Sequence, residues 1–323
     1  MFNHWQLYAG CAFLLLSLLL AVCYLYQWTG ARRDVRLSPA PGRLISVGDH
    51  MLHLLCKGSA GPVVVIEQGA GGLSKFWWPV QEEIAKFAQV CTYDRAGYGW
   101  SEPGPPGRTI EDRARELHTL LSRAQVQGPF ILVAHSYGGL IVRDYVREYP
   151  GEVAGLVLVD TPEESSIFRS EVLAFYSKAR ATNRVVGLAA RFGMLRLLRH
   201  WVPLDRIGLW LARPAEYSSL CDDLASLERV PTSMRASKSA GSLGSLPVIV
   251  ITHGQPFPGP FAVLEKNWSD GQSQLAALST DSILMVANDS NHMIQQDQPE
   301  LIVDAVRRMH AAVEKGASLV VSQ

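Results

Sequence analysis

The chain has 323 residues, in which 30 Lys and Arg are balanced by 30 Asp and Glu. Hydrophobic residues make up 48% and charged residues 19%, so the chain can bury a large core and is not a disordered polypeptide. The balanced charge leaves no basic footprint for nucleic acid, and we expect no nucleic-acid partner.

The N-terminal segment, residues 1–31, contains no Lys, Arg, Asp or Glu. Leu7 to Tyr26 are nearly all apolar, and as a helix they would rise about 30 Å, the thickness of a hydrocarbon core. Trp5 and Trp28 flank this run, as interfacial aromatic residues do. A cleaved signal peptide is the alternative, but no basic region precedes the run and the run exceeds a usual signal core. We predict an uncleaved, single-pass membrane anchor.

A linker, residues 32–41, follows the anchor and carries Arg32, Arg33 and Arg36. Basic residues next to a membrane span gather on its cytoplasmic side. The linker therefore predicts a cytoplasmic C-terminal domain, with a secreted or lumenal domain as the alternative.

Short apolar runs then alternate with helix-like segments. "GRLISV" and "HMLHLLCKG" flank Gly48 and Asp49 as in a β-hairpin. The later runs are typical of buried parallel strands: "PVVVIEQG", "QVCTYDR", "PFILVAHS", "VAGLVLVD", "LPVIVITHG" and "SILMVAN". Strands that alternate with helices form a mostly parallel sheet covered on both faces. We predict one α/β core in two parts, residues 42–161 and 245–323.

Residues 162–244 interrupt this alternation and are too many for an ordinary connection. They include apolar stretches with spaced Arg, such as "VVGLAARFGMLRLLRHWV" and "LDRIGLWLA", which predict an inserted helical cap. From Arg184 to Val202 there are four Arg and no acidic residue. This part either touches a membrane surface or packs over a pocket with a solvated basic face.

The five cysteines show no metal-ligand spacing, and we expect neither a metal nor a cofactor. Cys11 and Cys23 lie in the anchor. Cys56, Cys91 and Cys221 are far apart and are predicted to be buried free thiols. A Cys56–Cys91 disulfide between neighbouring strands is the alternative.

The segment "PFILVAHSYGG", residues 129–139, places Ser136 where an apolar strand meets a helix. At such a turn the serine hydroxyl projects above the sheet, and small residues two positions before and after it let strand and helix approach closely. Ala134 and Gly138 hold those positions here, so the pattern is A-x-S-x-G rather than G-x-S-x-G. The pattern predicts a nucleophile, with a tight structural turn as the alternative.

With this motif, the chain resembles the α/β-hydrolase superfamily, specifically its serine-nucleophile, esterase- and lipase-like members with a helical cap. The resemblance extends from residue 42 to 310 and rests on "AHSYGG", "YDRAGYGWS", "GLVLVD" and "NHMIQQDQPELIVDAV". It implies an eight-stranded, mostly parallel sheet with an inserted cap, and a base histidine in the loop after the last strand. Of the nine histidines, His292 stands in that loop.

The acid that orients the histidine is less well defined, because no Asp or Glu follows the strand "LPVIVITHG" before Glu265. We favour Asp160, at the end of "GLVLVD", with Asp270 as the next candidate. The resemblance further implies that the backbone N–H groups of Ala70 and Tyr137 form an oxyanion hole. Asp94 and Arg95, in "YDRAGYGWS", are interpreted as scaffold.

These residues predict a membrane-anchored serine hydrolase that cleaves a carboxylic ester through an acyl-enzyme. The apolar anchor and cap favour an apolar or lipid-like substrate, and Trp77 and Trp78 are expected to line its pocket. The alternatives are an acyltransferase or perhydrolase with the same three residues, and a catalytically silent hydrolase fold that acts as a binding protein. The sequence does not define the oligomeric state.

Overall fold

The computed structural model describes residues 4–198, 213–230, 241–266 and 268–320. Eight strands form one sheet in the order β1-β2-β4-β3-β5-β6-β7-β8. The strands are β1 (Arg43–Ser46), β2 (Met51–Lys57), β3 (Val63–Glu67), β4 (Val90–Tyr93), β5 (Phe130–His135), β6 (Val153–Val159), β7 (Val248–His253) and β8 (Ser282–Ala287). The pairs β1–β2 and β2–β4 are antiparallel and the others are parallel, which confirms the predicted sheet.

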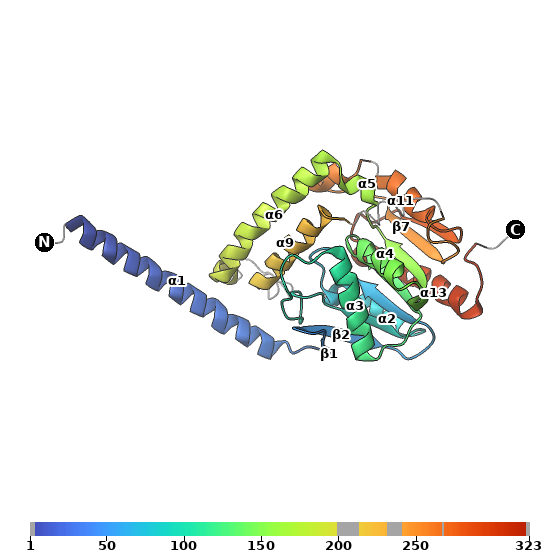
Figure 1. The fold of residues 1–323 in the computed structure, drawn as a ribbon, viewed down its shortest axis with the longest axis horizontal. Helices are drawn as coiled ribbons and strands as arrows, with labels where there is room; N and C mark the ends of the chain where they lie inside the picture. Colours follow the sequence, from blue (N-terminus) through green and yellow to red (C-terminus); the bar gives the residue numbers. More distant parts are fainter. Residues whose placement is uncertain (1–3, 199–212, 231–240, 267, 321–323) are drawn as a thin grey trace.

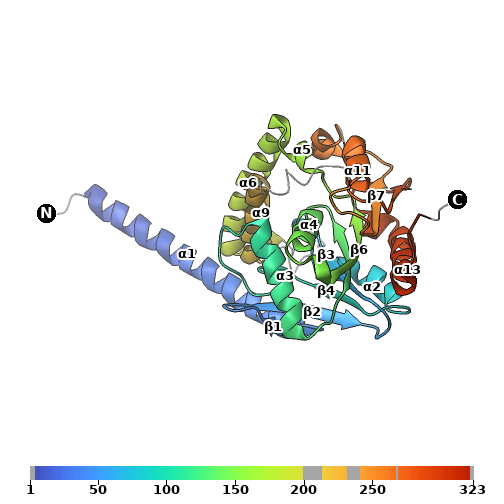
Figure 2. The ribbon, with the colours of Figure 1, turned by 45° about the vertical axis from the view of Figure 1, so that its right-hand side comes forward.

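Helices cover both faces of this sheet (Figure 1, Figure 2). One apolar core lies under α3 (Ile110–Ala124), α4 (Gly138–Glu148) and α11 (Trp268–Ala276), and the other lies under α2 (Trp78–Ile84) and α13 (Pro299–Lys315). The central strands β3, β5 and β7 are buried along their whole length, as strands covered on both faces must be. Because these strands are packed on both faces, the positions of their ends are fixed by the core.

The cap lies between β6 and β7 in the chain and consists of α5 (Glu164–Ile167), α6 (Ser170–Arg191), α7 (Met194–Leu198) and α9 (Pro214–Leu227). The long helices α6 and α9 run side by side, on the side of the molecule nearest the N-terminal helix (Figure 1, Figure 2). The predicted cap stretch "LDRIGLWLA", residues 204–212, lies outside the described residues.

The N-terminal helix α1 (His4–Leu37) is 34 residues long and projects away from the rest of the molecule (Figure 1). Its most apolar window has a mean hydropathy of 2.2 and is not buried against the protein, so α1 is long and apolar enough to cross a membrane. A single helix of this kind suggests membrane association. Only its C-terminal part, where Gln27 and Asp34 are buried, packs against the cap.

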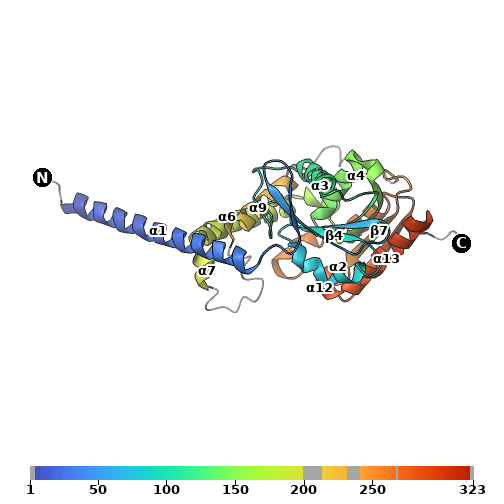
Figure 3. The same ribbon diagram turned by 90° about the horizontal axis from the view of Figure 1, so that it is seen from below.

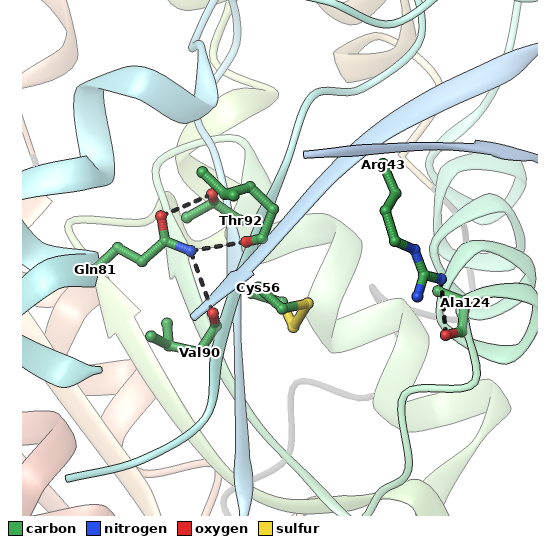
Figure 4. The surroundings of a disulfide bond; sticks show 8 residues. Arg43, Cys56, Gln81, Val90, Thr92 and Ala124 are labelled. Carbon is green, nitrogen blue, oxygen red and sulfur yellow. Dashed lines mark hydrogen bonds between the residues drawn. A yellow bond between two sulfur atoms is a disulfide. The ribbon is translucent and has the colours of Figure 1, made fainter. Parts of the chain in front are cut away.

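The prediction that Cys56 and Cys91 are free thiols is wrong. The antiparallel register of β2 and β4 places these residues opposite each other, with 4.0 Å between their Cα atoms, and they form a disulfide (Figure 4). Beside the disulfide, the Gln81 amide donates hydrogen bonds to the Leu55 and Val90 carbonyl oxygens, which ties α2 to both strands. Cys221 is buried and free, as predicted.

Candidate active site

Ser136 stands at the sharp turn between β5 and α4. Its backbone φ is +50°, a left-handed conformation that is uncommon for a residue with a side chain. A Cβ atom at Gly138 would lie 2.7 Å from the Gln68 carbonyl oxygen, so position 138 requires glycine for the helix to approach β3. Ala134 is fully buried in the sheet, and its extra methyl group relative to glycine is accommodated. The small-residue pattern therefore has the steric role that the sequence indicated.

The structure brings Ser136, His292 and Asp160 together, although they lie on three separate segments. The Ser136 Oγ is 2.9 Å from His292 Nε2, and His292 Nδ1 is 2.6 Å from Asp160 Oδ2. Ser136 follows β5, Asp160 follows β6 and His292 lies between β8 and α12 (Ile294–Asp297). Because carboxyl ends of parallel strands meet at one edge of the sheet, the fold delivers these groups to one place. The arrangement is that of a nucleophile, its base and an orienting carboxylate.

Asp160 is the carboxylate that contacts His292 in this cluster, whereas Asp270, the other candidate acid, is exposed on α11. The Asp160 carboxylate is fully buried and accepts hydrogen bonds from more groups than His292. The Trp268 indole N–H donates to Oδ1 at 2.8 Å, and the His253 backbone N–H donates to the same oxygen at 3.1 Å. His253 Nδ1 lies 2.7 Å from Oδ2, the oxygen that His292 also binds. Two imidazoles thus share one carboxylate oxygen.

Known proteins share this fold. The family model described as "alpha/beta hydrolase fold" matches residues 62–200. An esterase of Thermogutta terrifontis is similar, with a TM-score of 0.63, 21% identity, and 84% of this chain and 97% of that chain covered. The Cif epoxide hydrolase of Acinetobacter nosocomialis is similar too, with a TM-score of 0.65, 15% identity, and 88% and 96% covered.

Over residues 62–200 the chain matches the α/β-hydrolase fold family, and solved hydrolases share its fold.

Two relatives match at the level of sequence. The uncharacterized protein YqjL of Bacillus subtilis is 28% identical over 246 residues, which are 76% of this chain and 82% of that protein. A putative carbamate hydrolase, RutD, of Cronobacter turicensis is 35% identical over 100 residues, but these are only 31% of this chain and 37% of that protein. The comparisons agree on a hydrolase fold. The esterase and the epoxide hydrolase carry different chemistry on that fold, so the reaction must be argued from the site.

The electrostatics of the candidate site centre on Asp160. Burial alone would raise the pKa of its carboxyl, but hydrogen bonds from His253 and His292 outweigh burial and hold that pKa well below its usual range. For His253, burial opposes protonation, yet the hydrogen bond to Asp160 and the negative charges of Asp160 and Glu265 raise its pKa above the ordinary value. The carboxylate therefore stays ionised beside a histidine that readily carries a positive charge.

His135 is a second residue that the sequence did not single out. Its ring lies 4.6 Å from the His292 ring, centroid to centroid, and its Nε2–H donates to the His292 backbone carbonyl oxygen at 2.8 Å. Burial and the neighbouring His292 lower the pKa of His135 to about 3, so its imidazole stays neutral. A neutral ring at this place holds the backbone of the base loop without adding a competing charge.

The loop that was predicted to supply an oxyanion hole lies against the nucleophile. A Cβ atom at Gly69 would be 3.2 Å from the Ser136 Cβ, so the Gly69 backbone passes close to the serine. The N–H groups of Ala70 and Tyr137 make no hydrogen bond within the described part of the chain. Backbone donors without a protein partner are suited to bind a developing oxyanion. The role of Ala70 and Tyr137 stays a prediction.

Arg95 is structural, as its interpretation as scaffold requires, and it supports this loop. Its guanidinium donates to the carbonyl oxygens of Gln68 at 2.6 Å and Gly69 at 2.7 Å, and it pairs with Glu67 at 2.6 Å. It also contacts Asp223 of the cap at 2.9 Å. Arg95 thereby links the candidate oxyanion loop to α9.

Asp223 is the centre of this link to the cap. Besides Arg95, it accepts hydrogen bonds from Arg113 at 2.7 Å and from the Tyr98 hydroxyl at 2.9 Å, and all four side chains are buried. Charge-assisted hydrogen bonds from these two arginines to the one carboxylate hold cap helix α9 against the core. No local sequence pattern indicates this partner, because a single Asp on an amphipathic helix is typical of a surface acid.

The tryptophans predicted to line a pocket take different places. Trp77 is only 1% exposed and belongs to the core beneath the sheet, which corrects its assignment to a pocket. Trp78 stacks against Trp100, with 5.8 Å between ring centroids.

Proposed function

We propose that this hydrolase cleaves a carboxylic ester through an acyl-enzyme formed on Ser136. The observation that carries the proposal is the continuous chain from Ser136 Oγ through both His292 nitrogens to Asp160, with distances of 2.9 Å and 2.6 Å. A serine hydroxyl is a weak nucleophile unless a positioned base takes its proton. A structural turn needs no histidine at hydrogen-bond distance from the serine, nor a buried carboxylate behind that histidine.

In this mechanism Ser136 Oγ attacks the ester carbonyl carbon while its proton passes to His292 Nε2. The carbonyl oxygen becomes an oxyanion, which the Ala70 and Tyr137 N–H groups stabilise. His292 then gives the proton to the departing alkoxide, and the acyl group stays on Ser136. Water then removes the acyl group in the same way: His292 takes a proton from water while the water oxygen attacks the acyl carbon. His292 returns this proton to Ser136 Oγ as the carboxylic acid leaves. Asp160 remains ionised throughout and stabilises the His292 imidazolium.

An apolar ester is the proposed substrate class. Leu73 and Tyr98 form a small apolar cluster with Phe76, Trp100 and Leu220, beside the loop that carries Ala70. Leu220 belongs to cap helix α9 and is the side chain nearest to Gly71, so the cap brings an apolar surface to the oxyanion loop. Burial of an acyl chain there contributes about 0.8 kcal/mol for each methylene group.

We propose that α1 anchors the hydrolase as a single-pass helix and that the domain faces an oxidising compartment. Arg32, Arg33 and Arg36 alone predict a cytoplasmic domain. The Cys56–Cys91 disulfide argues against this orientation, because cytosolic thiols are kept reduced. The disulfide lies within the folded domain, where the antiparallel register of β2 and β4 brings the two cysteines together.

Labelling by a fluorophosphonate probe tests the enzyme. Wild-type protein should be labelled and should hydrolyse a p-nitrophenyl ester, and Ser136→Ala should abolish both. A folded wild-type protein that neither labels nor hydrolyses would favour the catalytically silent alternative. Asp160→Asn should lower kcat by several orders of magnitude, whereas the exposed Asp270→Asn serves as the matched control and should leave kcat unchanged. Adding alcohol or peroxide acceptors distinguishes hydrolysis from acyl transfer and perhydrolysis.

A further inference from the structure

Cap helix α7 contacts the N-terminal helix α1 near the C-terminal end of α1. Arg196 of α7 is buried, and its guanidinium contacts two residues of α1: Asp34 at 2.6 Å and Gln27 at 3.1 Å. The helices also approach closely at Gly193, because a Cβ atom there would lie 2.9 Å from the Tyr26 ring and 3.5 Å from the Cys23 carbonyl oxygen. Figure 3 shows α7 beside the C-terminal part of α1. A buried ion pair of this kind holds α7 in place relative to α1.

These contacts begin where the apolar run of α1 ends. The run ends at Tyr26, and a helix rises 1.5 Å per residue, so residues 27–34 lie within about 12 Å beyond the hydrocarbon boundary. If α1 crosses a bilayer, Gly193 stands at that boundary and Arg196 stands at the level of the headgroups. The inference therefore rests on the proposed anchoring of α1.

The same part of the cap leaves large apolar side chains in solvent. We call it the α6–α7 corner and define it by Val185 and Leu188 of α6 and by Met194, Leu197 and Leu198 of α7, all of which are exposed. Their spacing of three and four residues places them along one side of each helix. An exposed apolar group of this kind marks an interaction site in a soluble protein domain.

Positive charges accompany this apolar corner. Arg184 and Arg191 of α6 are exposed, and so are Arg32, Arg33 and Arg36 of α1. Apolar side chains with arginines around them are typical of segments that lie in the interface of a bilayer, where the arginines contact anionic headgroups.

We propose that the α6–α7 corner inserts into the headgroup boundary of the same bilayer that α1 crosses. The occupant of this surface is the lipid itself. Two attachments, α1 and the corner, fix the tilt of the domain and hold the cap against the membrane. An apolar ester can then pass from the bilayer to the cap without crossing bulk water.

The test uses the full chain in nanodiscs of phosphatidylcholine and phosphatidylglycerol. Cys11 and Cys23 are replaced by Ala, and an environment-sensitive NBD dye is attached to Leu197→Cys. Val286→Cys is the matched control, because Val286 on β8 is 49% exposed and Leu197 is 50% exposed. Leu16→Cys reports the insertion of α1. The background without an added cysteine measures any labelling of the buried Cys221.

We expect blue-shifted emission at position 197 and several-fold stronger quenching by a headgroup-nitroxide lipid than at position 286. Water-like, unquenched emission at 197 together with a membrane-buried probe at 16 overturns the corner insertion alone and leaves the anchor intact. A water-exposed probe at 16 overturns both proposals. A blue shift at 197 without lipid quenching shows that protein, such as a second copy of the chain, covers the corner, and this result also overturns insertion into lipid.

Discussion

His253 is expected to set the pH range in which the proposed hydrolase works. It is a positioning residue, because it acts on His292 through Asp160: the two Nδ1 atoms lie 2.7 Å and 2.6 Å from the same carboxylate oxygen. The charged groups that face His253 are Asp160 from the end of β6, Glu265 after η3 (Gly259–Leu264) at 3.4 Å, and His292 across the shared carboxylate. A proton on His253 therefore opposes a proton on His292.

The perturbation is His253→Gln, and its sign follows from this geometry. Burial lowers the pKa of His253, but Asp160 and Glu265 outweigh burial and raise that pKa above its ordinary value. A positive charge on the His253 ring disfavours a second positive charge beside the shared Asp160 oxygen. Two unit charges roughly 5 Å apart at an effective dielectric constant of about 20 interact by about 3 kcal/mol. Since one pKa unit equals about 1.4 kcal/mol, this interaction corresponds to at most about 2 units. Solvent screening at the partly exposed His292 ring reduces the expected upward move of the acid limb to about 1 to 2 units.

The assay is kcat/KM for a p-nitrophenyl ester between pH 4 and pH 9, where the acid limb reports the base of the free enzyme. We expect His253→Gln to lose about 10- to 100-fold at pH values below both limbs and to approach wild type on the alkaline plateau. His118→Gln is the control, because His118 also contacts a carboxylate, Glu152 at 3.1 Å, but lies away from the site. An unchanged acid limb with intact activity would refute the reasoning, and a uniform loss at every pH would show a purely structural role.

Three further outcomes are expected. The pKa of His253 is raised in the folded state, so protonation of His253 stabilises the fold. This stabilisation is fully present below the ordinary pKa of 6.5 and is lost as pH rises through the pKa of the folded state. His253→Gln should therefore lower the free energy of unfolding more at pH 6 than at pH 9. Asp223→Ala leaves two buried arginines without their shared partner and should lower the free energy of unfolding by about 3 to 5 kcal/mol in chemical denaturation. A loss below about 1 kcal/mol would contradict the network. Asp222→Ala is the control and should change the free energy of unfolding little. Cys56→Ser should lower the free energy of unfolding by about 2 to 4 kcal/mol. A reductant should destabilise the wild type but not this variant. If the reductant destabilises both proteins equally, Cys56 forms no disulfide with Cys91.

Much of the site was predictable because its signals are local. A strand is recognised from a few consecutive apolar residues, and the Ser136 turn from small residues two positions away on either side. His292 and Asp160 each follow an apolar run, and strand ends converge in any parallel sheet. The order of the strands was accessible through resemblance to a known fold.

The partners of Asp160 and Arg95 were decided by the tertiary structure. His253 and Asp160 are 93 residues apart in the chain, and Arg95 and Asp223 are 128 apart. The histidine looks like the polar end of a strand, and the aspartate looks like a surface acid. Such pairs leave no local pattern, because the chain between them only has to bring two side chains to the same place.

The sequence by itself determined the apolar N-terminal helix, the parallel sheet and the three side chains that meet at its edge, since periodicity and turn residues act over a few positions. The tertiary structure decided which charges are paired, through the second histidine on Asp160, the cap aspartate between two arginines and the tie between Arg196 and Asp34. It also decided that Cys56 faces Cys91, because the register of two strands is a property of the assembled sheet. Long-range pairing is specified by the packing of the whole fold, and no segment of the chain encodes it alone.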